Sequence, residues 1–231
     1  MLPLAFVHGS TTSVFVFVAI CIAILLAIIR AIVTARPNSI RLALGVCTWM
    51  GVYCAAIAAI VSSGILQRAF IPLGLIFLVG TVAIAISIGF TPLGRDIAAR
   101  VPLVWLVGIQ GFRLPLELVL HEWRASGTIP ETMTWTGSNW DIVSGTMACL
   151  VCPFVAKRQV LAWLFNIVGI ILLVNVGRVA ILSSPIPIGW QVDPPLELIL
   201  YLPYAYIVPI CIGGAALGHV LLTRRLTSRS V

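Results

Sequence analysis

The residues of this sequence that could do chemistry are concentrated in one apolar stretch near the middle of the chain. Gln110, Arg113, Glu117, His121 and Arg124 are spaced three or four residues apart. On an α-helix they form one polar stripe within an arc of about 80°. A carboxylate held between an arginine and a histidine can act as a general acid or base. We therefore take Glu117 and His121 as the candidate catalytic residues.

The stripe is expected to run from near the middle of a membrane to its outer surface. If Trp123 marks the outer boundary, Arg113 lies about 15 Å, Glu117 about 9 Å and His121 about 3 Å below it. Arg113 and Glu117, and Glu117 and His121, are four residues apart and can touch directly. Charged groups are expensive in lipid, so the stripe must face the bundle interior or a water-filled cavity.

Two further apolar stretches carry polar residues at a similar depth. Asn139 and Asp141 open one of them, at its expected outer boundary, and Asn175 and Arg178 lie about 60° apart on the other. These four residues and Arg113 are the candidate binding residues for an ion, an anion or a lipid headgroup.

Pairing among these residues has two interpretations. An unpaired arginine below the membrane surface is costly, so we expect Arg178 to reach Asp141 or Glu117 in a shared site. Alternatively, Arg113–Glu117 and Asp141–Arg178 form a structural ion-pair network, in which Asp141 also caps its helix.

The elements that must position these residues are membrane-spanning helices. Of the 231 residues, 61% are hydrophobic and only 9% are charged, against about 25% charged in soluble domains. A spanning helix needs about 20 mostly apolar residues, and lipid leaves no partner for an open strand edge. The sequence predicts an all-α polytopic bundle, a single integral membrane domain over residues 1–231, with seven helices near 12–33, 42–66, 70–92, 101–123, 141–156, 160–182 and 196–222. The segment 141–156 is the weakest of these, and Pro203 and Pro209 should kink the last helix.

Basic residues indicate the orientation. They gather in the first, third and fifth connections and in the C-terminal tail, whereas the connection 183–195 carries none. Because basic loops mark the cytoplasmic side, we expect the N-terminus outside and the C-terminus in the cytoplasm. The first basic residue, Arg30, follows the first apolar run, which favours a retained helix over a cleaved signal peptide.

Several functions are disfavoured by the composition. The net charge of +7 is spread between apolar segments, unlike the clustered basic face of a nucleic-acid-binding protein. Lys157, the one lysine of the sequence, falls in a turn, so a retinal Schiff base is not expected and the cofactor, if any, is unknown. Cys149 and Cys152 lack a complementary Cys/His pair for zinc, and we interpret them as packing residues.

Three short stretches resemble an uncharacterised family of bacterial multi-span membrane proteins. They are Phe-Arg-Leu-Pro-Leu-Glu at 112–117, Gly-Ser-Asn-Trp-Asp at 137–141 and Leu-Ser-Ser-Pro-Ile-Pro at 182–187. The resemblance covers about residues 105–222. It implies a bacterial origin, hence the inner (plasma) membrane, and a shared fold, with no known activity.

A shorter stretch, Asn-Val-Gly-Arg-Val at 175–179, is similar to the arginine motif of exosortases and archaeosortases. These are membrane transpeptidases with a cysteine, an arginine and a histidine at the outer face. By order along the chain, the resemblance implies Cys149 as the nucleophile. The surroundings of Cys149 depart from the family's motif, and no external histidine follows Arg178.

Three functions remain open. The first is a membrane enzyme at the outer leaflet that uses Glu117 and His121. The second is a protein that binds a lipid or small anionic ligand at Arg113 and Arg178. The third is a non-catalytic subunit or scaffold of a larger membrane complex. In each case the expected partners are membrane lipids and other membrane proteins, and the site lies in the outer half of the fourth to sixth helices.

Overall fold

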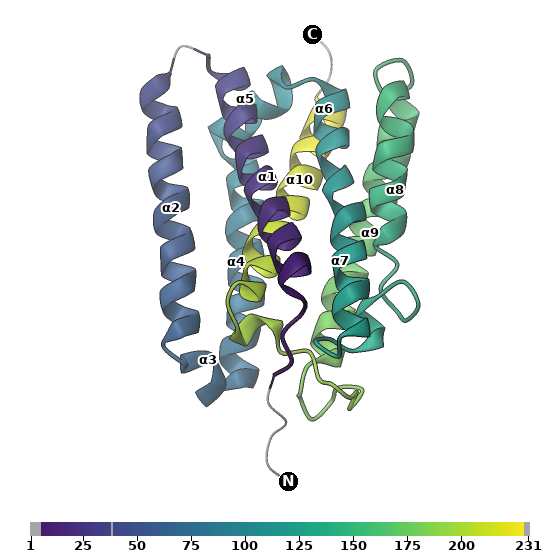
Figure 1. Cartoon of the computed structure of the whole chain (residues 1–231). Coiled ribbons are helices and arrows are strands. Elements are labelled where there is room, and N and C mark those ends of the chain that lie inside the picture. Colours follow the sequence, from purple (N-terminus) through teal and green to yellow (C-terminus); the bar gives the residue numbers. More distant parts are fainter. Residues whose placement is uncertain (1–5, 38, 229–231) are drawn as a thin grey trace.

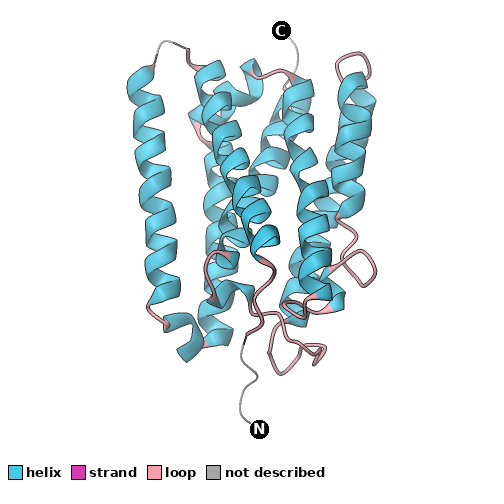
Figure 2. Ribbon diagram, in the orientation of Figure 1, coloured by secondary structure: helices cyan, strands magenta, loops and turns pink. Residues whose placement is uncertain are grey.

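The computed structural model describes residues 6–37 and 39–228, which form a bundle of helices (Figures 1 and 2). Within these residues, six helices are long and apolar enough to cross a membrane. They are Thr11–Ala35, Ile40–Ser62, Phe70–Phe90, Leu103–Ala125, Gln159–Ser183 and Tyr204–Thr227, and a shorter apolar helix spans Ile142–Phe154. The chain is therefore a polytopic membrane helix bundle, as the sequence predicts.

Four of these helices are uninterrupted. They are α1 (Thr11–Ala35), α2 (Ile40–Ser62), α4 (Phe70–Phe90) and α9 (Gln159–Ser183). Two short helices, α3 (Ile65–Arg68) and α5 (Pro92–Arg100), lie before and after α4. Helix α8 (Ile142–Val151) continues into the 3-10 turn Cys152–Phe154. Helix α1 begins at one end of the bundle and helix α10 ends at the other (Figure 1).

The span Leu103–Ala125, which carries the polar stripe, consists of two helices. Helix α6 (Leu103–Gly108) and helix α7 (Arg113–Ala125) are joined by a 3-10 turn, Ile109–Phe112. Pro115 has no N–H to donate to the carbonyl of Gly111, which interrupts the α-helical hydrogen-bond ladder at this point. The tighter turn therefore lies directly before Arg113.

The last span differs from the prediction at its start. It begins at Tyr204 rather than near residue 196 and extends to Thr227, because Pro203 would lie inside a helix that began near 196, where proline has no N–H for the hydrogen-bond ladder. Residues before it form a loop with the 3-10 turn Leu198–Leu200, and Tyr204–Ile207 is a further 3-10 turn. Pro203 therefore precedes the helix and kinks nothing. Pro209 lies in a π-helical turn, Val208–Ile212, whose wider backbone leads into α10 (Gly213–Thr227).

Helix α10 lies in the centre of the bundle (Figure 1) and contacts α4, α5, α6 and α9. Two of its glycines make this close packing possible. A Cβ at Gly214 would be 3.0 Å from Ile24 of α1, and one at Gly218 would overlap the Gln110 side chain. The small residues at 214 and 218 thus act in helix packing, as their spacing predicts.

Candidate functional site

The inner part of the polar stripe faces the protein interior. Gln110, Arg113 and Glu117 are each only 1% exposed, as the cost of placing them in lipid predicts. Towards the end of α7, His121 is half-buried and Arg124 is exposed. Arg124 forms a 3.1 Å ion pair with Glu131 in the following connection.

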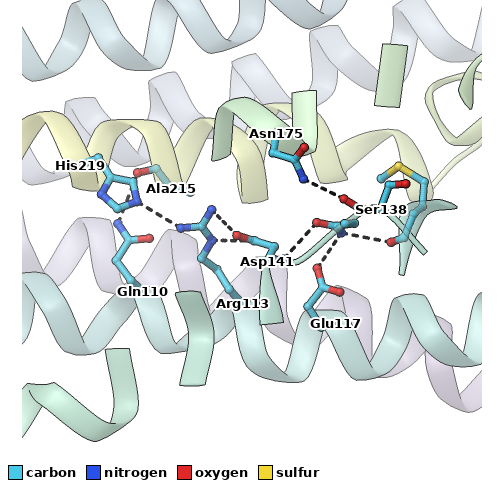
Figure 3. A network of polar contacts seen from close by, with 10 residues as sticks. Gln110, Arg113, Glu117, Ser138, Asp141, Asn175, Ala215 and His219 are labelled. Carbon is cyan, nitrogen blue, oxygen red and sulfur yellow. Dashed lines mark hydrogen bonds and ion pairs between the residues drawn. The ribbon is translucent and has the colours of Figure 1, made fainter. Parts of the chain in front are cut away.

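Arg113 is held by two other helices (Figure 3). Its Nε atom donates to Oδ2 of Asp141 at 2.7 Å, and its Nη2 atom lies 2.6 Å from Oδ1 of the same carboxylate. Its Nη1 atom is 3.1 Å from Nε2 of His219 in α10. The expected pairing of Arg113 with Glu117 is therefore wrong, because the guanidinium group of Arg113 pairs with Asp141 instead.

Asp141 reaches Arg113 because the connection 126–141 folds back into the bundle. Ile129, Met133 and Asn139 of this segment are almost fully buried. Arg113 is the first residue of α7, about 18 Å along the helix from Ala125, so Asp141 is deep rather than at the membrane boundary. It makes no side-chain cap to α8, so the capping role expected of it is not observed.

His219 is a buried member of the site that the sequence analysis missed. An arginine only donates hydrogen bonds, so Nε2 of His219 accepts from Arg113 and its ring is neutral. The proton is on Nδ1, which donates to Oδ1 of Asn166 at 2.9 Å, and Asn166 in turn donates to Oγ1 of Thr223 at 2.8 Å. The one signal for His219 was an ionisable residue inside an apolar helix.

Glu117 is linked to this network through Asn139. Its Oε1 atom accepts a 2.9 Å hydrogen bond from Nδ2 of Asn139, and the same nitrogen donates to the carbonyl of Met133 at 3.1 Å. The Oδ1 atom of Asn139 accepts from the backbone N–H of Asp141 at 3.2 Å. The second oxygen of Glu117, Oε2, is buried and has no hydrogen-bond partner among the described residues.

The other candidate residues lie apart from Glu117. The ring of His121 stacks on Trp135 with centroids 4.2 Å apart. Asn175 donates to the carbonyl of Ser138 at 2.8 Å and accepts from Arg178. Arg178 is exposed and lies 5.5 Å over the ring of Trp190. Its contacts in the described chain therefore do not include the carboxylate that we expected, because Asp141 has turned towards Arg113.

A cavity of about 420 Å³ opens beside Glu117. Its walls come from the first half of α4, from α7, from the last half of α9 and from residues 186–215, and most are apolar. Arg113, Glu117, Asn139 and Asp141 provide polar groups in its wall, whereas His121, Asn175 and Arg178 do not line it. The volume falls in the usual range for a small-molecule site, about 300–1,000 Å³.

The arrangement can hold a molecule with one polar end. The polar side chains near Glu117 are those of Arg113, Asn139 and Asp141, and all three already have hydrogen-bond or ion-pair partners. The Oε2 atom of Glu117 has none among the described residues, so it could accept a hydrogen bond from a ligand. His121, the expected acid–base partner of this carboxylate, is not brought to it, since its ring stacks on Trp135 outside the cavity wall. The geometry therefore suits binding better than proton transfer between two side chains.

Comparison with known proteins identifies a family. The model of the domain of unknown function DUF8737 matches residues 70–227, more than half of the chain. The chain therefore belongs to this family. The matched region includes α4 to α10 and every residue of the site described above. No curated protein and no solved structure matches the chain.

Proposed function

We propose that this DUF8737 protein binds a lipid-like molecule inside the membrane, with an apolar chain in the cavity and a polar end at Glu117. The observation that carries the proposal is Glu117, which lines a mostly apolar cavity and whose Oε2 atom is buried without a hydrogen-bond partner among the described residues. A buried polar group without a hydrogen bond costs about 1–3 kcal/mol. A ligand that supplies the missing donor would recover that free energy.

The shape of the cavity supports an elongated apolar ligand. Its walls include residues 70–78 of α4 and 173–181 of α9, which extend about 12 Å along each helix. Ile71 and Leu75 of α4 line the cavity and are also exposed, as is Ile188 of the connection after α9. In a membrane these residues face lipid, so a chain could enter from the bilayer without crossing water.

Catalysis and a purely structural role receive less support. An enzyme that uses Glu117 and His121 as a pair would need both in one cavity. A scaffold would need its buried polar groups paired. Arg113 and Asp141 are paired with each other, but the Oε2 atom of Glu117 has no hydrogen-bond partner among the described residues. A transpeptidase would need Cys149 beside Arg178. Cys149 instead faces Gly111 in the preceding span, and Arg178 contacts Asn175 and Trp190.

The proposal includes a location for the site. The protein would lie in the plasma membrane of a bacterial cell with its N-terminus outside, so that the cavity opens to the outer leaflet. The distribution of basic residues supports this orientation. At the end of the bundle that would face the cytoplasm, two of these basic residues bind backbone carbonyls. Arg224 donates to the carbonyls of Gly89 and Thr91, and Arg225 donates to that of Ala99.

A cavity-filling substitution tests the proposal. Ala180 of α9 lines the cavity and is half-buried, so Ala180→Phe should fill part of its volume. Val174, on the same helix, is 68% exposed, and Val174→Phe is the matched control. Native mass spectrometry of protein purified in mild detergent should detect bound lipid in the wild type and in Val174→Phe, and much less in Ala180→Phe. Equal lipid binding by all three proteins would refute binding in this cavity.

A further inference from the structure

We propose that the polar end of the ligand is a primary ammonium group, so that the cavity selects long-chain amines over fatty acids and phosphate-bearing lipids. This inference rests on the proposed function, because it assigns a chemical class to the molecule that occupies the same cavity. It is carried by the charges and the hydrogen-bond donors around Glu117, taken together with the apolar walls.

The charges of the cavity wall do not cancel. Its charged residues are Arg113, Glu117 and Asp141. Arg113 and Asp141 neutralise each other through two short contacts. Within the described residues Glu117 has no ion pair, and it accepts a hydrogen bond from the neutral amide of Asn139. The Glu117 carboxyl group therefore has no cationic partner among the described residues, and a nearby cation favours the ionised form of such a group.

Most hydrogen-bond donors around Glu117 already have a partner. Both N–H groups of the Asn139 amide are engaged, one by Glu117 and one by the carbonyl of Met133. Each of the three guanidinium nitrogens of Arg113 has a partner in Asp141 or His219. The hydroxyl of Ser184, near the end of α9, donates to the carbonyl of Ala180. The Oε2 atom of Glu117 is a buried acceptor without a hydrogen-bond partner among the described residues.

This pattern discriminates between headgroups. An ammonium group carries three donors and no acceptor, so it matches a site that offers a carboxylate oxygen. A carboxylate or phosphate headgroup carries only acceptors and negative charge, so it offers no donor to the Oε2 atom of Glu117. A hydroxyl could donate one hydrogen bond but would leave the charge uncompensated. The alkyl chain of the amine would lie along α4 and α9.

Photoaffinity labelling with four probes tests the headgroup. The probes are a long-chain primary amine, the alcohol and the fatty acid of the same length, and a phosphatidylethanolamine, each with a diazirine in the chain. Labelling of the detergent-purified protein is titrated and the labelled peptides are mapped by mass spectrometry. We expect the amine to label the segments 70–78 and 173–188 at the lowest concentration, well below the fatty acid.

Two α7 variants separate the specific effect from general membrane partitioning. Hydrogen bonds to charged groups are strong, so Glu117→Gln should weaken amine labelling about ten- to hundredfold while the alcohol changes little. Glu122→Gln removes a carboxylate that does not line the cavity and should leave all labelling unchanged. Thermal unfolding of each variant in detergent verifies that it is folded, and Glu117→Ala serves as a second variant if Glu117→Gln is not.

The outcomes distinguish the headgroup from the cavity. Preferential labelling by phosphatidylethanolamine over the amine would overturn the selection against phosphate-bearing lipids. If the amine, alcohol and fatty acid label the cavity alike, and Glu117→Gln has no effect, the ammonium assignment fails while lipid binding stands. If no probe labels the cavity and Ala180→Phe changes nothing, the proposed function itself fails.

Discussion

Arg113 and Asp141 form an ion pair in the interior of the bundle, although they lie 28 positions apart and on different helices. The pair joins α7 to the start of α8 and requires the connection between them to fold back into the protein. Gly145 allows the two helices to meet, since a Cβ at this position would overlap the backbone of Leu114. Through His219 the same arginine is tied to α10.

Breaking this ion pair should destabilise the protein strongly. Asp141→Ala leaves the Arg113 guanidinium buried without its carboxylate, and removal of one partner of a buried pair costs about 3–5 kcal/mol. The double variant Arg113→Met with Asp141→Leu removes both charges and should lose much less. Chemical unfolding in detergent measures both. An Asp141→Ala variant as stable as the wild type would show that the pair does not hold the helices together.

The contact between α9 and α10 should depend on a glycine. A Cβ at Gly169 would overlap the ring of His219, whereas one at Gly177, on the same helix, would meet nothing within 4 Å. Gly169→Ala should therefore lower the free energy of unfolding by about 1–3 kcal/mol through overpacking. Gly177→Ala should be neutral or raise it by up to about 1 kcal/mol, because alanine favours helix. Equal effects of the two variants on the thermal midpoint would contradict this packing.

The connection before the last span should make stability depend on pH. Burial raises the pKa of the Glu197 carboxyl above its ordinary value of 4.5, so folding favours the neutral form. Below pH 4.5 both folded and unfolded states are protonated and burial has no charge penalty. As the pH rises through the raised pKa, the penalty develops and the wild type loses stability.

Glu197→Gln removes this titration. The variant should melt at a higher temperature than the wild type at pH 7 to 8, and the difference should shrink as the pH falls below 4.5. Thermal midpoints of both proteins between pH 4 and 8 provide the comparison. A constant difference over that range would mean that the Glu197 carboxyl is not the titrating group.

The helices themselves were predictable because each is a long apolar run. Six of the seven expected segments agree with the structure to within about four residues at each end. The last one began too early, since a loop rich in leucine and proline has the same hydropathy as a helix. The burial of Gln110, Arg113 and Glu117 was also predictable, because a helical stripe of polar residues cannot face lipid.

The partners within the site were not predictable from the sequence. Spacing along one helix favoured Arg113–Glu117 contact, but the connection 126–141 folds inward and brings Asp141 to the arginine instead. This depends on the packing of a loop, which has no periodic signal. His219 is 106 positions from Arg113, and only the three-dimensional arrangement of α7, α9 and α10 brings it to the site.

The proposed orientation can be tested by labelling from outside the cell. Single cysteines at Ser126 or Gln191, which are exposed in the two long connections, should react with a membrane-impermeant maleimide in intact cells. Cysteines at Arg158 or Thr227, exposed at the other end, should react only after the membrane is opened. The same four positions are tested in a background in which the native cysteines are replaced by alanine. Labelling of Thr227→Cys in intact cells would overturn the proposed orientation.

The most direct test of the account is an experimental structure of the protein in lipid nanodiscs made from native membrane lipids. We predict elongated density in the cavity between α4, α7 and α9, ending within hydrogen-bond distance of Oε2 of Glu117. The same map of Ala180→Phe should lack this density. A cavity in the wild type that is closed, or that holds only water beside Glu117, would contradict the proposal that this protein binds a lipid-like molecule.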